Sequence, residues 1–185
     1  MTDNENHKTA GFRPELFAIA AEKAKGDKKL PPVHLWNPDF CGDIDMCINR
    51  DGSWDYMGTP ISRQRMVKLF STILRQDKDQ YYLVTPVEKV GIKVVDAPFV
   101  AVEMEVEDKQ ILFRTNLDDY VNVGKENPIR VSINNQTGEP SPYVLVRDRL
   151  EALISRNVYY QLVDIAVENN GEYGVWSGGE FFPLS

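Results

Sequence analysis

The sequence predicts an α+β protein made of two related small domains. Its 185 residues, of which 42% are hydrophobic and 26% charged, have the composition of a globular chain and the length of one large or two small domains. Segments with period-two alternation, typical of strands, are interspersed with segments of helical periodicity. A strand, a turn, an extended segment and an arginine follow one another from Ile48 to Arg63, and the same order recurs from Ile133 to Arg149. These offsets, 85 and 86 residues, suggest a duplicated strand-hairpin-helix motif.

The first predicted element is a helix over residues 15–25. Pro14 suits a first helical turn, Gly26 ends the helix, and the segment 27–32, with its lysines and prolines, is typical of a linker. Residues 1–35 are therefore expected to be a tail, a helix and a linker. The tail contains His7 and lacks the basic, apolar and small-residue order of a secretory signal.

The first domain is predicted over residues 36–85. Residues 43–49 alternate as in a half-buried strand, and Asp51-Gly52 predicts a hairpin with a type I′ turn. A helix then opens at Thr59-Pro60 or at Ser62 and ends before Asp77. Its predicted buried face consists of Val67, Phe70, Ile73 and Leu74. Residues 81–85 are predicted to be a strand.

The second domain is predicted over residues 86–185. Residues rich in β-branched and aromatic side chains predict strands at 87–94, 99–106, 111–115, 120–123 and 129–134. A short helix is predicted over 148–154, and Ser155 either breaks it or caps a longer helix over 156–168. The glycine pair in the turn 177–179 predicts a closing hairpin of strands 173–176 and 180–184.

The charge distribution limits the classes of partner. The net charge is −7; residues 1–85 hold 12 basic and 12 acidic side chains, whereas residues 86–185 hold 9 basic and 16 acidic ones. An acidic domain repels a phosphate backbone, so general binding of nucleic acid is not expected. No apolar run reaches the roughly 20 residues of a membrane span, and a cytoplasmic protein without a membrane partner is expected.

Arg63 is the first candidate for ligand binding. Four basic residues and no acidic one lie between Asp55 and Asp77, and Arg63 is placed in the first turn of the predicted helix, where an arginine can clamp a phosphate or carboxylate. A solvated helix face explains the other basic residues of this stretch equally well. Arg147, Arg149 and Arg156 form a second basic group, for which salt bridging with Asp148 and Glu151 is the alternative. Four aromatic residues are candidates for stacking on a ring, with core packing as the alternative: Trp54, Tyr56, Tyr82 and Trp176.

Catalytic and metal chemistry find little support. His34 is the only histidine outside the tail, and Cys41 and Cys47 lack the spacing of a zinc or redox site. The acidic residues between 43 and 55 do not follow the calcium-loop pattern, so turn formation is the expected role, and the glutamates at 103, 105 and 107 suggest the outer face of an edge strand. Phosphate-binding, dinucleotide and nucleophile-elbow motifs are missing from the sequence. We therefore predict no catalytic residue, no metal site and no cofactor.

Several short runs resemble the bacterial family catalogued as domain of unknown function 1285. They are CGDIDM at 41–46, RDGSWDY at 50–56, GTPISR at 58–63, LF at 69–70, YLVTPVEKV at 82–90, DAPF at 96–99, LEA at 150–152, YY at 159–160 and GVWSGG at 174–179. The resemblance covers about residues 36–184 and leaves out the N-terminal helix.

The resemblance implies two α+β domains with a duplicated motif, the second similar to a partly open pleckstrin-homology-like barrel with helices. It also implies a nucleotide-like ligand between the domains, in bacterial signal transduction. The positions of this chain that it suggests for ligand contact are Trp54, Arg63, Thr85, Glu88, Trp176 and Ser177. Arg149 joins them from the repeat.

Three hypotheses follow from these observations. The first is a sensor, with no catalytic role, that holds a small anionic, nucleotide-type molecule where the two halves meet, with Arg63 on its phosphate. The second is a protein-interaction module, the usual role of a pleckstrin-like barrel. The third is a hydrolase that uses the carboxylates Asp43, Asp45, Asp51 and Asp55 with a divalent metal, and it ranks last because candidate ligands and histidines are few.

Overall fold

The computed structural model describes residues 11–27 and 29–185 as two compact units. The first unit ends at Val95, and the second begins at Asp96 and takes in the loop Arg50–Gly52. His7 and the rest of the tail at 1–10 lie outside the described residues, as does residue 28 of the linker. Within the described ranges, every helix is too short or too polar to cross a membrane.

The first unit contains a mixed sheet of six strands in the order β3-β2-β1-β6-β5-β4. Its elements are α1 (Pro14–Lys25), a 3-10 turn (Val33–Leu35), β1 (Phe40–Ile48), β2 (Trp54–Tyr56), β3 (Thr59–Pro60), α2 (Gln64–Thr72), β4 (Leu74–Asp77), β5 (Gln80–Val84) and β6 (Lys89–Val94). The strands β1 and β6 pair in parallel, and each is continued outward by antiparallel neighbours. The predicted helix 15–25 and strand 81–85 are confirmed.

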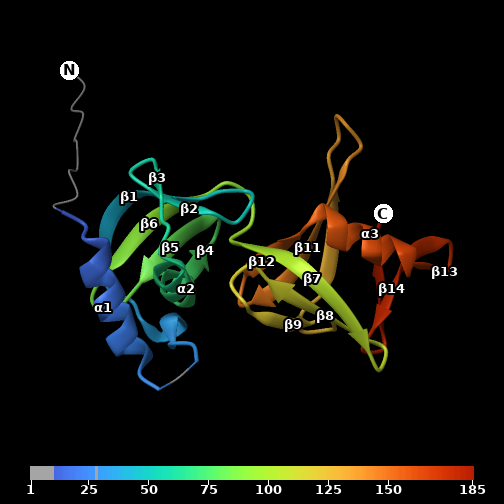
Figure 1. The fold of residues 1–185 in the computed structure, drawn as a ribbon, viewed down its shortest axis with the longest axis horizontal. Helices are drawn as coiled ribbons and strands as arrows, with labels where there is room; N and C mark the ends of the chain where they lie inside the picture. The colour runs from blue at the N-terminus through green and yellow to red at the C-terminus, as the bar shows by residue number, and fades with distance from the viewer. Residues whose placement is uncertain (1–10, 28) are drawn as a thin grey trace. The chain divides into compact units, whose positions relative to one another are not determined.

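The helices α1 and α2 of the first unit pack beside each other (Figure 1). Val67 and Phe70 of α2 are buried as predicted, and so are Ile73 and Leu74, which follow the helix rather than belong to it. Phe17 and Ala21, four residues apart and therefore on one face of α1, are buried as well. Burial of these apolar faces holds both helices in the unit, since neither is long enough to be stable alone.

The second unit contains a six-stranded sheet in the order β10-β11-β12-β7-β8-β9 and a three-stranded sheet, β13-β14-β15. Its elements are β7 (Phe99–Glu107), β8 (Gln110–Thr115), β9 (Tyr120–Asn122), β10 (Ile129–Ile133), β11 (Pro140–Arg147), β12 (Leu150–Ile154), α3 (Arg156–Asp164), β13 (Val167–Asn169), β14 (Glu172–Ser177) and β15 (Glu180–Pro183). The larger sheet curls into a half-barrel, and α3 packs on β7 and β14 (Figure 1). The core includes Phe99, Phe113, Leu150 and Leu162, all with 1% exposure or less.

The two six-stranded sheets have the same topology. Each consists of two antiparallel meanders of three strands, and the first strand of the first meander pairs in parallel with the last strand of the second. The predicted relation between the halves is therefore present in the sheets. Its alignment differs from the predicted offsets, because the topology matches β1 with β7, whereas Ile133 ends β10.

The prediction of a helix over 148–154 is wrong, because Leu150–Ile154 forms the strand β12. Its residues Leu150, Ala152 and Ile154 are buried and alternate with partly exposed neighbours, and Ala152 pairs with Phe99 of β7. Arg149 consequently lies in the turn between β11 and β12 and does not start a helix. The helix α3 is also shorter than predicted, since it ends at Asp164 and gives way to β13.

The structure can be compared with the predictions at two turns and at the boundary of the first unit. The hairpin at Asp51-Gly52 exists, but only Gly52 of the pair has positive φ, and its loop is closed by a bond from the Asn49 N–H to the Ser53 carbonyl, so it is not a type I′ turn. The Gly178-Gly179 turn has positive φ at both residues and joins paired strands as predicted. The first unit extends beyond the predicted limit at residue 85, because β6 pairs with β1 and β5.

Candidate functional site

Arg63 occupies the N-cap position of α2, one residue before the helix begins. Its backbone is extended, and its side chain makes no capping bond to the helix. The predicted caps Thr59 and Ser62 lie farther from the helix start, so they do not cap it either. The first turn contains no acidic residue. Since Ser, Thr, Asp and Asn are the residues that stabilise this position, Arg63 is not explained by helix formation.

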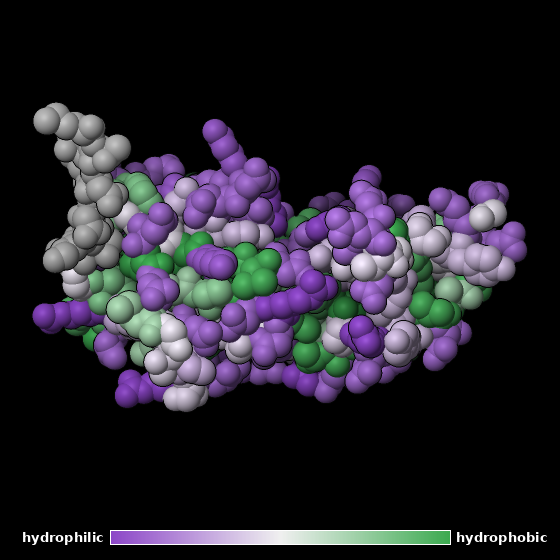
Figure 2. All heavy atoms as spheres, turned by 90° about the horizontal axis from the view of Figure 1, so that it is seen from above, coloured by the Kyte–Doolittle hydropathy of each residue, from purple (hydrophilic) through white to green (hydrophobic). Residues whose placement is uncertain are grey.

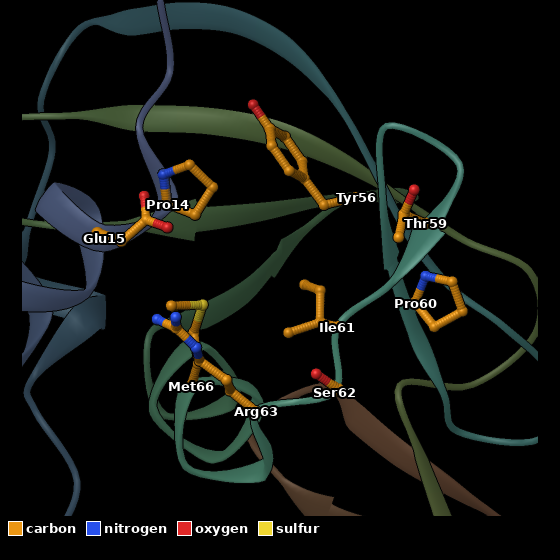
Figure 3. Close-up of a pocket in the computed structure, with 9 residues that line it drawn as sticks. All are labelled: Pro14, Glu15, Tyr56, Thr59, Pro60, Ile61, Ser62, Arg63 and Met66. Carbon is orange, nitrogen blue, oxygen red and sulfur yellow. The ribbon is translucent and has the colours of Figure 1, made fainter.

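A hollow of about 250 Å³ lies beside Arg63. It is lined by Pro14, Glu15, Tyr56, Thr59, Pro60, Ile61, Ser62, Arg63 and Met66. Figure 3 shows Met66 on α2 and Arg63 just before the helix, Ile61 directed into the space between them and Tyr56, and Glu15 facing the space from α1. The lining therefore combines the cation of Arg63, the aromatic ring of Tyr56, the apolar side chains of Ile61 and Met66, and the carboxylate of Glu15.

A second hollow of about 320 Å³ shares Arg63 and Met66 with the first. Its other lining residues come from α1 and α2: Ala18, Ile19, Glu22, Arg65 and Leu69. Together the two hollows follow the groove between these helices, with Arg63 at the place where they meet.

Neither Arg63 nor Arg65 forms an ion pair or a side-chain hydrogen bond with any residue that the structure describes. Both side chains are exposed at the rim of the groove. A guanidinium that is not engaged by a carboxylate keeps its planar donors for a ligand, and it matches phosphate and carboxylate oxygens in pairs. The groove can therefore accept an anion next to an apolar or aromatic surface.

Tyr56 is held in place on the wall of the first hollow. Its hydroxyl donates to the carbonyl oxygen of Phe12 at 3.2 Å, and the two rings meet edge to face with centroids 5.8 Å apart. The ring of Phe12 also packs against that of Phe17 of α1, with 5.1 Å between the ring centroids. This chain of contacts orients the Tyr56 ring and ties the start of α1 to the hollow.

Arg75, which belongs to the same basic stretch, has a structural role. Its guanidinium donates to the carbonyl oxygens of Val33 and Trp36 at 3.0 and 2.6 Å and to the Asp77 carboxylate at 2.9 Å. Lys89 reaches the same carboxylate at 2.8 Å. Although burial alone would raise it, the pKa of Asp77 is lowered by the bonds from Lys89 and Arg75. The cluster fastens residues 33–36 to the edge of the sheet and is satisfied within the protein.

The other predicted contacts in the first unit lie apart from the groove. Trp54 is 2% exposed and stacks on Phe70, and its indole N–H has no partner among the described residues. Thr85 is buried, and its hydroxyl accepts the backbone N–H groups of Val87 and Glu88 at 3.4 and 3.1 Å. Glu88 is exposed in that same turn. Of these residues and Arg63, only Arg63 lines either hollow.

The remaining predicted contacts belong to the second unit. Ser177 is buried, accepts the N–H of Ile111 at 2.9 Å and donates to the Val123 carbonyl at 2.7 Å. Trp176 is 50% exposed on β14 and contacts the ring of Phe181. Arg149 is exposed in its turn. That one ligand joins these residues to those of the first unit stays a prediction.

The structure adds residues to the candidate site that the sequence analysis did not consider. Glu15 and Ile19 come from α1, and Met66 and Leu69 from the helix already predicted. The position of Met66, three residues after Arg63, is the signal that was available, because such residues share a helix face. Within the described ranges, no group of three or more His, Cys, Asp or Glu side chains is placed to hold a metal ion.

Comparisons with known proteins agree on one family. Residues 31–97 match the family model "Domain of unknown function (DUF1285), N-terminal domain", and residues 98–184 match "Protein of unknown function (DUF1285), C-terminal domain". A DUF1285 family protein from Silicibacter pomeroyi DSS-3, known from its crystal structure, is 53% identical, with a TM-score of 0.83 over 90% of this chain and 93% of that one.

A second crystal structure, a DUF1285 family protein from Shewanella baltica OS155, is 30% identical. Its TM-score is 0.54, and the match covers 65% of this chain and 91% of that one. A comparison with curated proteins gave no match.

Proposed function

The chain belongs to the DUF1285 family, whose two domains are described only as being of unknown function, and we propose from the geometry of its own residues that it binds a small anionic ligand. The observation that carries the proposal is the position of Arg63. This arginine stands at a helix start that it does not stabilise, has no partner among the described residues, and lines both hollows of one groove.

The walls around Arg63 favour a ligand of the nucleotide type. The guanidinium supplies a contact for a phosphate, while Tyr56, Ile61 and Met66 offer an aromatic and apolar surface to a ring. Glu15 faces the same space and can accept a hydrogen bond from an amino group, which a simple inorganic anion lacks. A phosphate joined to a ring with donor groups uses all of these side chains.

The proposed role is that of a sensor in signal transduction in the cytoplasm. A ligand in the groove would contact both α1 and α2, because the lining residues come from both helices. Binding would therefore stabilise α1, which buries only Phe17 and Ala21 and exposes Leu16 and Ile19. A helix held by so few buried side chains is suited to respond to a ligand.

A thermal-shift screen with nucleotides and cyclic dinucleotides tests this proposal. A ligand at a hundred times its dissociation constant should stabilise the protein by about 2.7 kcal/mol. The shift should disappear in Arg63→Ala and persist in Lys23→Ala, which removes an exposed lysine of α1 outside both hollows. No shift with any of these compounds, or an equal shift in Arg63→Ala, would reject the proposal.

A protein-interaction module is the second candidate, supported by the outer face of the three-stranded sheet. Trp176 and Val167 are about half exposed there, and Phe181 lies against Trp176 at 5.4 Å between ring centroids. Figure 2 shows one face of the molecule, on which hydrophobic side chains are scattered among hydrophilic ones rather than gathered in a single patch. Sedimentation that detects self-association of the wild type and its loss in Trp176→Ser would favour this candidate, whereas a monomer in both cases would count against it.

A further inference from the structure

A cavity with a volume of about 490 Å³ lies in the second unit. It is lined by residues of the β10–β11 connection, the start of β11, the end of β12 and the start of α3, and by Arg50, which belongs to the same unit. Its volume is within the range of pockets that hold small organic ligands, about 300–1,000 Å³.

We propose that this cavity is a second ligand site, which takes a small molecule that carries a phosphomonoester on a planar ring. The site is separate from the groove at Arg63 and does not depend on it. Four features of the lining support this assignment: its cations, its serine hydroxyl groups, the aromatic and proline rings of its walls, and its single carboxylate.

The cations are Arg156 and Arg50. Arg156 is exposed and has no partner among the residues that the structure describes. The side chain of Arg50 is 61% exposed, and its contacts with Asp96 and Ser141 are long, at 3.4 and 3.5 Å. Both guanidinium groups therefore keep donors for a ligand. Two guanidinium groups suit a doubly charged phosphomonoester better than a single carboxylate.

Two serine hydroxyl groups lie in the same lining. Ser155 holds the N-cap position of α3, yet its side chain makes no capping bond, so its hydroxyl is available to a ligand. Ser141 contributes a second hydroxyl to the lining, but this group is engaged by Arg50 at 3.5 Å and by Tyr143. Asn134 is occupied instead, because its side-chain oxygen accepts the backbone N–H groups of Gln136 and Thr137 at 2.9 and 3.2 Å. The Ser155 hydroxyl and the two arginines together supply donors from separate elements of the unit.

The walls are suited to a ring. Tyr159 is fixed by its hydroxyl, which donates to the Leu184 carbonyl at 2.8 Å, while Tyr160 is 57% exposed. Pro140, Pro142 and Leu153 add apolar surface. A planar ring that lies against such side chains is held by stacking and by burial of apolar area.

Glu139 also lines the cavity and limits the charge of the ligand. A carboxylate in the same space repels a long polyphosphate, whereas a single phosphate can be placed on the arginines. We therefore expect a monophosphate to bind more tightly than the corresponding triphosphate.

Titration of the ¹⁵N-labelled full chain with phenyl phosphate, followed by NMR, tests the assignment. The amide signals of Ser141, Ser155 and Arg156 should shift and saturate. Inorganic phosphate and phenol, which each supply half of the probe, should bind at least about tenfold more weakly. Adenosine monophosphate should shift the same signals and bind more tightly than the triphosphate.

Variants complete the test. Arg156→Ala should weaken phenyl phosphate about tenfold, since it removes a charge-assisted contact. Its side chain is exposed and unpaired in the described part of the chain, so the variant should fold, and Lys125→Ala, an exposed lysine outside the cavity, serves as the matched control. Unchanged affinity in Arg156→Ala, shifts confined to residues around Arg63, or no saturable shift would overturn this site. The last two outcomes are separable from failure at the groove, because each site has its own amide signals.

Discussion

The two units contain the same arrangement of six strands but place their helices differently. In the first unit, α2 connects the two meanders, whereas in the second unit α3 follows them. Both helices nevertheless start beside an arginine, Arg63 or Arg156, and neither has an acidic residue in its first turn. A positive charge at a helix N-terminus is unfavourable. The sheets therefore account for the fold of both units, whereas the two arginines need another explanation.

The hollows beside these arginines also differ. In the first unit the groove is divided between hollows of about 250 and 320 Å³ and depends on α1, which lies outside the sheet. In the second unit one cavity of about 490 Å³ is built from strands and from α3 itself. We therefore expect binding in the first unit to be coupled to the packing of α1 and binding in the second unit to be independent of it.

Truncation of a side chain that anchors a helix in the core should cause the largest loss of stability. Phe70 on α2 and Leu162 on α3 are both fully buried. Phe70→Ala should lower the free energy of unfolding by about 3–5 kcal/mol and Leu162→Ala by about 2–5 kcal/mol, because each leaves a cavity in a packed core. Urea denaturation measures both. A loss below about 1 kcal/mol for either variant would show that its helix is not part of the core of its unit.

The next largest loss of stability should come from removing an arginine that forms ion pairs, and it should differ between the two units. Arg75→Ala should cost about 2–3 kcal/mol, because it removes charge-assisted bonds to Asp77 and to two backbone carbonyls. Arg114 of the second unit also bonds two carboxylates, those of Glu103 and Asp118, but on an exposed strand face. Arg114→Ala should therefore cost clearly less in the same denaturation experiment. Equal losses would contradict the distinction between a buried anchor and a surface network.

A smaller effect, of opposite sign, is expected at the helix starts. Arg63→Asp should raise the free energy of unfolding by about 1 kcal/mol, since aspartate caps a helix and complements its dipole. Arg156→Glu should raise it by about 0.5 kcal/mol. Both variants should lose ligand binding in their own unit. If either arginine variant is less stable than the wild type, the arginine is structural after all.

The smallest effects should appear in the pH dependence of stability, at acid pH in the first unit and at alkaline pH in the second. The lowered pKa of Asp77 means that its contribution is present above the unfolded value of 3.8 and is lost as the pH falls through the folded pKa. Burial, and then the 2.7 Å bond to Asp96, raise the pKa of Tyr143. Its contribution is therefore present below pH 10 and is lost as the pH rises through the folded pKa.

Asp77→Asn should flatten the acid limb of the stability curve, and Tyr143→Phe should flatten the alkaline limb. Because Asp77 is partly exposed and screened by solvent, its share should stay below about 1 kcal/mol. Denaturation midpoints measured across pH for both variants test the assignment. It fails if either variant keeps the slope of the wild type at its own end.

Local patterns predicted much of the fold. The alternation around Ile44, Met46 and Ile48 identified the strand that becomes β1, and these three residues are buried. The glycine pair at 178–179 identified the last hairpin, because positive φ at both positions is a requirement of the turn itself. Such features depend on residues close in sequence and can be recognised without the rest of the chain.

The strand β12 could not be identified in the same way. Its residues, Leu-Glu-Ala-Leu-Ile, are good helix formers, and helix propensity competed with a period-two pattern of only five residues. The strand is decided by its parallel pairing with β7, which begins about fifty residues earlier in the chain. The same kind of long-range contact explains why the true alignment of the repeat escaped the sequence offsets.

The candidate site was predictable only in part. Arg63 stood out because its stretch of the chain has no acidic residue. The groove itself forms only when α1 packs on α2, so Glu15 and Ile19 could not be assigned to it from local sequence. Trp54, Thr85 and Ser177 carried motif signals but are buried, and their neighbours explain them as packing and turn residues.

The most direct measurement is a thermal melt of the wild type and Arg63→Asp side by side, with and without a saturating nucleotide. We predict that the variant melts higher than the wild type without ligand, and that only the wild type gains from the ligand. A variant that melts lower, or that gains as much as the wild type from the same nucleotide, would contradict the claim that this arginine is present for an anion rather than for the fold.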